Sequence, residues 1–316
     1  MKPAAHPCGV IFLDKPKGWT SRQAVSFVIQ CFSTPQQKNR KQRPKAGHAG
    51  TLDPLATGML PILLGEATRF ASFGLNAEKA YEVTFDLSFQ TDTLDLEGAV
   101  IAEYPDVHIS EALLNNTVFS FLGNIQQIPP IYSAIMVDGK RAHDRARKGE
   151  KIEMLAREVS IKSLEIINFE NTLVTLRVVC SKGTYIRSLA RDIGAAMGVG
   201  GCVTMLRRVS SGGWPEALMV STEEVAEKKD ACILPLQKWL WELPNIALNR
   251  DDAVRFVRGQ RLVREIGEIN KSANLFQVSS DGVMLGTATI ADKGEADVKY
   301  VLHPQRVLPS AQERFI

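Results

Sequence analysis

The order of apolar and polar residues along this chain predicts many strands separated by short helices. The apolar run Gly9–Leu13 predicts a first strand, and a Thr20–Gln23 capping box begins a helix that should end near Ser33. Further strands are predicted at 59–64, 79–89, 99–103, 132–137, 159–169, 172–180 and 203–209, and further helices at 66–73, 110–117, 140–148 and 184–197. Because few long helices intervene between the strands, we expect an α+β fold around a largely antiparallel mixed sheet, not a doubly wound one.

The composition changes near Leu243-Pro244-Asn245. Beyond this point the sequence predicts a short basic helix at 251–258 and strands at 274–279, 283–290 and 298–302. The 316 residues exceed the usual size of one domain, and the C-terminal part has about the smallest size that folds independently. We therefore expect two domains, a larger one at 1–243 and a small β-rich one at 244–316.

Composition places the chain among ordinary globular proteins. Hydrophobic residues make up 45% and charged residues 23%, and no stretch approaches the ~20 apolar residues of a membrane span or resembles a signal peptide. The five cysteines are scattered and form no CxxC pair, which argues against structural zinc and against a disulfide framework. We expect a cytoplasmic protein without membrane association.

The formal net charge of +3 conceals local basic clusters. A polar loop at 34–46 carries five lysines and arginines, a second cluster lies at 140–151, and Arg207-Arg208 forms a third. Such clusters are typical of a protein that follows an RNA backbone, although solvated helix faces remain an alternative for each cluster alone. Asp92, Asp95 and Glu97 indicate that the surface is not uniformly positive.

The segment Gly47–Gly58 (GHAGTLDPLATG) surrounds one carboxylate, Asp53, with three glycines and a proline. Glycine lets a backbone approach a ligand closely, and Pro54 biases Asp53 away from helical geometry. A carboxylate fixed in such a loop can act as a nucleophile or as a general base. The alternative is a tight surface turn, since Asp-Pro and Gly are common turn residues.

Three other residues could act together with Asp53. Arg187 lies in the first turn of a predicted helix, where a cation opposes the helix dipole unless an anion pairs with it. It could hold Asp53 in a bidentate pair, or it could be an ordinary surface arginine. Tyr81 near the start of a strand is either a packing residue or a platform for an extruded base. His48 could be a base, a metal ligand or an RNA contact, but no further metal ligands occur at a suitable spacing.

Several motifs occur in an order and at a spacing that resemble a known family. They are 9–18 (GVIFLDKPKG), 47–58, Tyr81 with 91–95 (TDTLD), 129–134 (PPIYSA), 139–142 (GKRA), 180–187 (CSKGTYIR) and 206–208 (LRR). Together they resemble the TruB family of tRNA pseudouridine synthases over almost the whole chain. The C-terminal module is similar to the small PUA-type RNA-binding domain of bacterial members, on the basis of its position, its size and a short pattern of Asp281-Gly282 followed by Leu285-Gly286.

The resemblance implies a pseudouridine synthase fold and the isomerisation of uridine 55 in the tRNA TΨC loop by base flipping. It implies no metal or organic cofactor and no obligate protein partner, and we expect a monomer that binds the tRNA T-arm. By motif match, Asp53 is the nucleophile and Arg187 its partner. Tyr81 is similar to a tyrosine that stacks on the flipped uracil and is a candidate for removing the C5 proton.

The resemblance also assigns residues around the pocket. Leu206 matches an apolar residue that packs it, His48 and Tyr185 match residues that contact the extruded nucleotide, and Lys15 and Pro16 match a motif that supports the pocket. The sequence departs from the family pattern at the residues Ala49, Ser88 and His143, and the loop 34–46 is longer and more basic than expected. These departures concern fine contacts with the substrate more than activity.

Some alternatives stay open at this point. Asp53 could attack either ribose C1′ or uracil C6, and the sequence does not choose between them. The protein could instead be a non-catalytic RNA-binding or RNA-folding protein. It could also be a guide-dependent synthase subunit that acts on ribosomal RNA.

Overall fold

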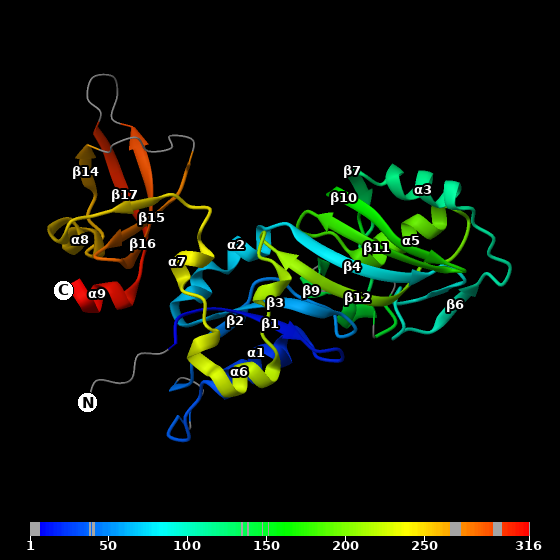
Figure 1. Ribbon diagram of the computed structural model, residues 1–316, viewed down its shortest axis with the longest axis horizontal. Coiled ribbons are helices and arrows are strands. Elements are labelled where there is room, and N and C mark those ends of the chain that lie inside the picture. The colour runs from blue at the N-terminus through cyan, green and yellow to red at the C-terminus, as the bar shows by residue number, and fades with distance from the viewer. Residues whose placement is uncertain are drawn as a thin grey trace.

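One large sheet forms the main body of the protein (Figure 1). The computed structural model describes residues 7–315 except 38, 40, 41, 134, 138, 147, 151, 266–272 and 293–298. The eight strands of the sheet are β1 (Gly9–Lys15), β2 (Ala46–His48), β3 (Thr57–Leu64), β4 (Lys79–Asp86), β7 (Gly123–Gln127), β10 (Arg157–Glu170), β11 (Leu173–Cys180) and β12 (Cys202–Ser211). Their order is β1-β3-β12-β4-β11-β10-β7, with β2 on β3. Only β3 and β12 pair in parallel, which confirms the largely antiparallel mixed sheet.

Three helices predicted from capping and spacing lie against this sheet. Helix α1 (Ser21–Cys31) begins at the predicted Thr20 capping box and buries Ala24 and Val28. Helix α3 (Glu111–Ser120) is capped by Ser110, as expected, but runs one turn further than predicted. Helix α5 (Ile186–Ala196) begins two residues later than predicted, so that Tyr185 becomes its N-cap. The predicted helix at 66–73 is a 3-10 helix (Gly65–Phe70) followed by α2 (Ala71–Asn76).

The register of the sheet places three residues of interest in one row. Arg208 on β12 lies opposite Gly58 on β3 and opposite Tyr81 on β4. Successive side chains of a strand point to opposite faces, so Arg207 faces away from Arg208. The row therefore joins the strand that follows the Asp53 loop to the strand that carries Tyr81.

A second, five-stranded sheet follows Leu243 in the order β13-β15-β16-β17-β14 (Figure 1). Its strands are β13 (Asn245–Ala247), β14 (Leu262–Glu265), β15 (Phe276–Ser280), β16 (Val283–Asp292) and β17 (Lys299–Val307), and its helices are α8 (Arg250–Val257) and α9 (Pro309–Phe315). The helix and strands predicted here are confirmed, whereas β13, β14 and α9 were not predicted. Dividing the chain into domains 1–243 and 244–316 stays a prediction.

The two sheets share an apolar core. Phe70 and Trp239, from the N-terminal part, belong to the same buried cluster as Phe256 and Val278. The Glu66 carboxylate accepts hydrogen bonds from the backbone N–H of Ser310 at 2.9 Å and from its hydroxyl at 2.8 Å. These contacts fix the C-terminal sheet against the body of the protein.

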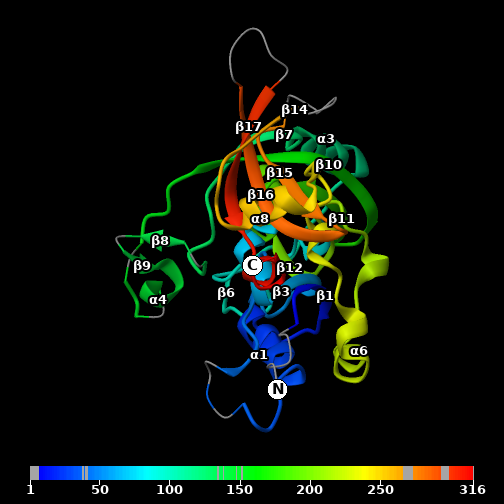
Figure 2. The same ribbon diagram turned by 90° about the vertical axis from the view of Figure 1, so that its left-hand side faces the viewer.

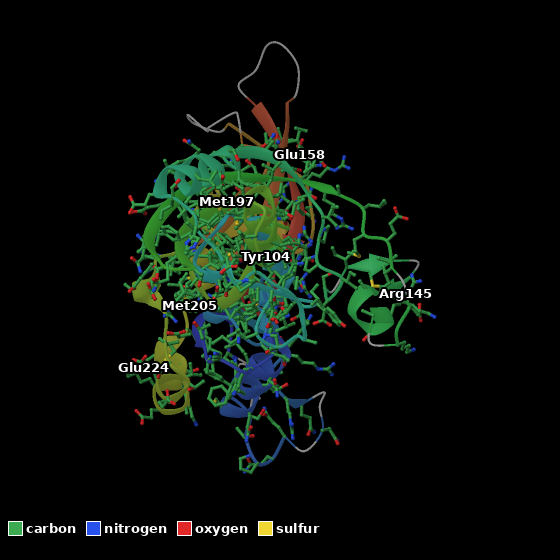
Figure 3. The ribbon with its side chains drawn as sticks, turned by 90° about the vertical axis from the view of Figure 1, so that its right-hand side faces the viewer. Tyr104, Arg145, Glu158, Met197, Met205 and Glu224 are labelled. Atoms are coloured by element: carbon green, nitrogen blue, oxygen red, sulfur yellow. The ribbon has the colours of Figure 1, made fainter. Side chains whose placement is uncertain are left out.

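A small arm projects beside the main sheet (Figures 2 and 3). It contains β8 (Met136–Val137), β9 (Lys140–Arg141) and α4 (Ala142–Ala146), and Arg145 on α4 is labelled in Figure 3. The predicted strand at 132–137 and helix at 140–148 are wrong in extent. Gly139, at a φ of +76°, turns the chain into a two-residue hairpin before a helix can begin.

Some sequence expectations fall on residues that the structure does not describe. The basic residues Lys38, Arg40, Lys41, Arg147 and Lys151 lie outside the described residues, and so does the side chain of His143. Strand β7 was missed because its sequence, GNIQQ, has neither an apolar run nor regular alternation. Within the described parts of the chain, no helix has the length and apolar character needed to cross a membrane.

Candidate active site

The loop that carries Asp53 is held on one side by the end of β1, the start of α1 and the turn between them. The Ser21 hydroxyl donates to the Leu52 carbonyl at 3.0 Å and accepts from the Leu52 N–H at 2.8 Å. The Pro54 carbonyl accepts from the Gly18 N–H at 2.8 Å and from Lys15 Nζ at 3.4 Å. Asp53 is therefore fixed between two anchored neighbours.

Lys15 and Pro16, which were predicted to support the pocket, lie at the end of β1 and in the turn after it, next to the Asp53 loop. Lys15 is fully buried, and its Nζ also donates to the carbonyls of Pro16 at 2.9 Å and Trp19 at 2.7 Å. Burial, the largest cause, lowers the pKa of Lys15 from 10.5 to about 8. The ammonium group thus ties the turn after β1 to the loop that carries Asp53.

Arg208 holds the other side of the Asp53 loop. Its guanidinium donates to the carbonyls of Met59 at 2.7 Å, Gly50 at 3.1 Å and Thr51 at 3.4 Å. A Cβ on Gly58, which has a φ of +95°, would overlap the backbone of Arg208. At Gly58 the close approach is therefore to the neighbouring strand β12 and not to a ligand.

Arg207 and Arg208 do not form the basic RNA-facing pair that was expected. Arg208 is only 1% exposed, and Arg207 makes a two-pronged pair with Asp14 at 2.8 and 3.0 Å and contacts Glu216 at 2.8 Å. The two arginines instead hold adjacent parts of the fold together, one on each face of β12.

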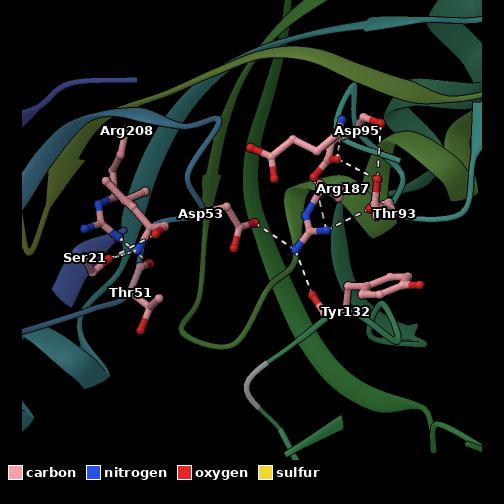
Figure 4. Close-up of polar contacts among 10 residues, drawn as sticks. Ser21, Thr51, Asp53, Thr93, Asp95, Tyr132, Arg187 and Arg208 are labelled. Atoms are coloured by element: carbon pink, nitrogen blue, oxygen red, sulfur yellow. Dashed lines mark hydrogen bonds and ion pairs between the residues drawn. The ribbon is translucent and has the colours of Figure 1, made fainter. Parts of the chain in front are cut away.

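Arg187 joins the Asp53 loop to two other segments (Figure 4). Its Nη2 lies 2.9 Å from Asp53 Oδ2 and donates to the Tyr132 carbonyl at 3.1 Å. Its Nη1 donates to the Thr93 carbonyl at 2.7 Å. Because Arg187 is 5% exposed, the alternative of an ordinary surface arginine is wrong, and the contact with Asp53 is made by one nitrogen instead of the bidentate pair expected.

Asp95 is a second carboxylate on the same guanidinium. Its Oδ2 lies 3.3 Å from Arg187 Nη1, and its Oδ1 accepts from the Thr93 hydroxyl at 2.6 Å and the Glu97 N–H at 3.0 Å. Asp95 is 3% exposed, so counting it among surface acids was wrong. The only sequence feature that marked Asp95 as unusual was its place in the turn-rich TDTLD segment. In the structure, Leu94 in this segment takes a φ of +65°.

Two cavities meet at Asp53. One of about 380 Å³ is lined by residues that include Lys79, Tyr81, Tyr185, Leu206 and Arg208. The other, of about 800 Å³, is lined by residues that include Arg22, His48, Asp92, Glu97 and Tyr132. Thr51, Leu52, Asp53, Ser133 and Arg187 line both. The Asp53 side chain is 36% exposed and is accessible from both cavities, which together have room for more than one small chemical group.

Tyr81, Tyr185 and Leu206, three of the predicted site residues, line the smaller cavity together, and their roles there stay predictions. Burial raises the pKa of Tyr81 and of Tyr185, while the positive charge of Arg208 opposes the rise at Tyr81. Tyr185 is anchored by Gln127, which accepts from its N–H at 2.8 Å and donates to its carbonyl at 3.1 Å. No motif in the sequence singles out Gln127, which is 1% exposed and lies on the strand that was not predicted.

His48 lines the larger cavity, away from Tyr81 and Leu206. Burial, and secondarily the charge of Arg208, lowers its pKa, which favours the neutral imidazole. Its Nδ1 is buried and has no hydrogen-bond partner among the described residues. Among those residues, no three His, Cys, Asp or Glu side chains gather as a metal site.

Comparison with known proteins identifies the family. The model of the TruB family pseudouridylate synthase N-terminal domain matches residues 38–186, and that of the tRNA pseudouridylate synthase B C-terminal domain matches 187–240. A tRNA pseudouridine synthase B of Aromatoleum aromaticum is 39% identical over 95% of this chain and 92% of its own length. The chain belongs to the TruB family of pseudouridylate synthases. A second TruB relative, a tRNA pseudouridine synthase B of Psychrobacter cryohalolentis, is 41% identical over 83% of this chain and 74% of its own.

Solved structures confirm the fold of this TruB family member. The structure titled as a Cbf5-Nop10-Gar1 complex contains a chain that matches with a TM-score of 0.70 and 24% identity, over 98% of this chain and 87% of its own. A chain in the archaeal box H/ACA sRNP Nop10-Cbf5 complex matches with a TM-score of 0.69 and 24% identity, over 98% of this chain and 88% of its own. At this identity the likeness concerns the arrangement of the backbone.

Proposed function

We propose that this protein isomerises uridine 55 in the TΨC loop of tRNA to pseudouridine, with Asp53 as the nucleophile. The observation that carries the proposal is the pair between Asp53 and the buried Arg187, placed where two cavities meet. Relatives 39–41% identical over most of the chain are named tRNA pseudouridine synthase B, which supports tRNA as the substrate.

The reaction requires one bond exchange and no other reactant. The N1–C1′ bond of uridine breaks, a C5–C1′ bond forms, C5 loses a proton and N1 gains one. A carboxylate can begin this exchange by attacking C1′ or C6, and both routes leave the same product. Asp53 Oδ2 pairs with Arg187, whereas its Oδ1 has no partner among the described residues, so Oδ1 is the atom we assign to the attack.

The neighbouring residues take the parts that the motif match implies. The uracil leaves its stack at a cost of a few kcal/mol, and stacking on Tyr81 offsets this cost within a pocket packed by Leu206. Tyr81 is also the candidate for removing the C5 proton, since it lines the same cavity as Asp53. His48 and Tyr185 contact the extruded nucleotide from the two cavities, while Lys15 and Pro16 support the loop.

The proposal also concerns how the protein works in the cell. We propose that it acts in the cytoplasm as a monomer, on the T-arm of tRNA, without a cofactor or an obligate protein partner. The part after Leu243 serves as a PUA-like RNA-binding domain. Light scattering after size-exclusion chromatography, with and without tRNA, tests the monomer.

Release of tritium tests the activity. A T-arm stem-loop labelled with tritium at uridine C5 should release tritium with the wild-type protein, and an RNA with cytidine in place of uridine 55 should yield no product. Asp53→Asn should abolish release while RNA affinity persists. Asp86→Asn, which removes a carboxylate at the far end of β4, is the matched control.

The same assay separates the alternatives. Binding of the stem-loop without tritium release by the wild-type protein would favour an RNA-binding or RNA-folding protein. Release that appears only when a guide RNA is added would favour a guide-dependent synthase. Full activity of Asp53→Asn would exclude Asp53 as the nucleophile.

A further inference from the structure

Lys79 is a buried cation in the wall of the smaller cavity, and the reaction described above does not use it. Its side chain is 7% exposed and lines the cavity together with Asp53 and Tyr81. Lys79 and Tyr81 are two positions apart on β4, so their side chains lie on the same face of the strand, about 7 Å apart along it. Lys79 is thus the neighbour of the tyrosine on which the uracil is proposed to stack.

The Lys79 ammonium group has a donor to spare. Its Nζ donates to the carbonyls of Ala77 at 2.6 Å and Leu75 at 3.0 Å. An ammonium group has three donors, so one N–H is left without a partner among the described residues. Burial is the largest cause that lowers the pKa of Lys79 from 10.5 to about 8, and the group therefore still carries its charge at pH 7. A buried charge without an opposite charge is costly, and such a cost is typical of functional sites.

A second cation without a carboxylate partner lies close to Lys79. Arg208 donates to carbonyls, and neither it nor Lys79 forms an ion pair in the described parts of the chain. Both side chains lie beside Gly50, where an added Cβ would be 3.8 Å from Lys79 Cε and 3.5 Å from Arg208 Nη1. Arg187, in contrast, contacts two carboxylates. The cavity wall therefore carries positive charge that no described residue balances.

The uracil ring acquires negative charge by either route of the reaction. If the carboxylate attacks C1′, the electrons of the N1–C1′ bond stay on the detached uracil. If it attacks C6, the electrons of the C5–C6 double bond move onto C5 and O4. In both routes the C5–C1′ bond then forms, the carboxylate is released, C5 loses a proton and N1 gains one. A fixed cation that faces the ring in a closed cavity stabilises this transient charge.

We propose that Lys79 is a further catalytic residue, whose ammonium group stabilises the negative charge that develops on the uracil in the smaller cavity. Its unpaired N–H donates to a uracil carbonyl oxygen, and Arg208 adds positive charge from the neighbouring strand. The inference rests on the proposed function, which places the uracil against Tyr81. There are two competing explanations: the two cations bind a phosphate of the RNA backbone, or Lys79 only holds the turn at 75–77.

Three substitutions of Lys79 separate its charge from its hydrogen bonds. Lys79→Gln removes the charge but keeps donors for the carbonyls of the turn, Lys79→Met removes both, and Lys79→Arg keeps the charge. They are compared at pH 7 by single-turnover pseudouridine formation in a T-arm stem-loop, by RNA Kd and by melting temperature. We expect both neutral variants to react about 100-fold more slowly and Lys79→Arg less than about tenfold more slowly, each with a Kd within about threefold of the wild type.

Lys162→Gln is the matched control, because it removes an exposed lysine that pairs with Glu78, the residue before Lys79. It should keep the wild-type rate. If Lys79→Met does not fold, the ratio of the rates of Lys79→Arg and Lys79→Gln decides, since these two variants differ in charge and both retain donors.

A fluorinated substrate gives a readout that a structural role would not move. Fluorine at C5 withdraws electrons, so the negative charge on 5-fluorouracil needs less stabilisation by a cation. Because 5-fluorouridine has no proton at C5 to lose, its conversion is followed as loss of this nucleoside from nuclease digests of the stem-loop. The effect of Lys79→Gln should shrink from about 100-fold with uridine to less than about tenfold with 5-fluorouridine.

The competing explanations have outcomes of their own. A Kd raised by about tenfold or more, with an unchanged rate at saturating protein, would assign the cations to a phosphate and overturn the proposal. A wild-type rate for Lys79→Gln, or equal losses with the two substrates, would assign Lys79 to the turn alone and would also overturn it. A wild-type protein that forms no pseudouridine would instead overturn the proposed function, and with it any role of Lys79 in that reaction.

Discussion

The Asp95 carboxylate lies 3.3 Å from Nη1 of Arg187, while Nη2 of the same guanidinium lies 2.9 Å from Asp53. Asp95 is almost fully buried and Asp53 is open to the cavities. The buried carboxylate therefore orients the arginine, and the arginine in turn orients the exposed carboxylate. Asp53 thus depends on a residue that lies 42 positions further along the sequence and to which it is linked through Arg187.

Asp95→Asn should slow pseudouridine formation by about 10- to 100-fold, since a charge-assisted contact of about 1.5–3 kcal/mol is lost from the group that orients Asp53. Asparagine keeps the shape and can still accept from the Thr93 hydroxyl. Single-turnover rates with a T-arm stem-loop measure the loss, and the RNA Kd should stay within about threefold. Asp86→Asn is the control, and a wild-type rate for Asp95→Asn would refute the orienting role.

The main elements of the fold could be predicted because their signals are local. The capping box at Thr20 and the alternation in β11 depend on neighbouring residues, and both are confirmed. Strand β7 could not be predicted, because it is held at the sheet by β10, which lies about 30 residues further along the chain. The hairpin Met136–Arg141 likewise depends on one turn at Gly139.

For the site, too, only residues marked by local sequence features could be predicted. Asp53, Tyr81 and Arg187 could be singled out, because a glycine-rich loop, a strand end and a helix start each constrain what a side chain can do. Asp95 and Arg208 could not, because their charges are neutralised or hydrogen-bonded by segments distant in sequence. A sequence presents a buried arginine and a surface arginine as the same letter, so Arg208 was assigned to an RNA-facing cluster.

Gly58→Ala should destabilise the protein by about 1–3 kcal/mol, because Gly58 has a φ of +95° and an added Cβ would overlap the backbone of Arg208. Urea unfolding followed by tryptophan fluorescence measures the loss. Gly47→Ala, on β2 at the start of the same segment, is the control, since a Cβ there meets no atom within 4 Å. Gly47→Ala should change the free energy of unfolding by less than about 0.5 kcal/mol. Equal effects of the two substitutions would contradict the argument.

Lys15 should make the stability depend on pH above about 8. The pKa of Lys15 is about 8 in the folded protein, whereas the ordinary value of 10.5 applies to the unfolded chain. Between pH 8 and 10.5 the unfolded chain therefore keeps a proton that the folded protein has released. The free energy of unfolding of the wild type should therefore rise relative to that of Lys15→Met between pH 8 and 10.5. Below pH 8 the difference should be constant. Lys79, whose pKa is also lowered to about 8, contributes equally to both proteins and cancels in the comparison. Denaturant titrations at several pH values test this, and a difference that stays flat up to pH 10.5 would contradict it.

Gln277→Leu should destabilise the protein by about 1–3 kcal/mol, because it removes a nearly buried amide that donates to three carbonyls. Gln277, on β15, is 6% exposed, and its Nε2 donates to the carbonyls of Leu240 at 2.7 Å, Gln237 at 3.2 Å and Leu243 at 3.3 Å. All three acceptors precede the predicted domain boundary, so one side chain fastens the second sheet to the chain that leads into it.

Gln305→Leu makes the same change at an exposed position of β17 and should cost less than about 0.5 kcal/mol. Denaturant unfolding of both variants measures the difference, and limited proteolysis should cut Gln277→Leu faster than Gln305→Leu between the two sheets. Similar stability and cleavage of the two variants would show that the second sheet is held by its apolar contacts alone.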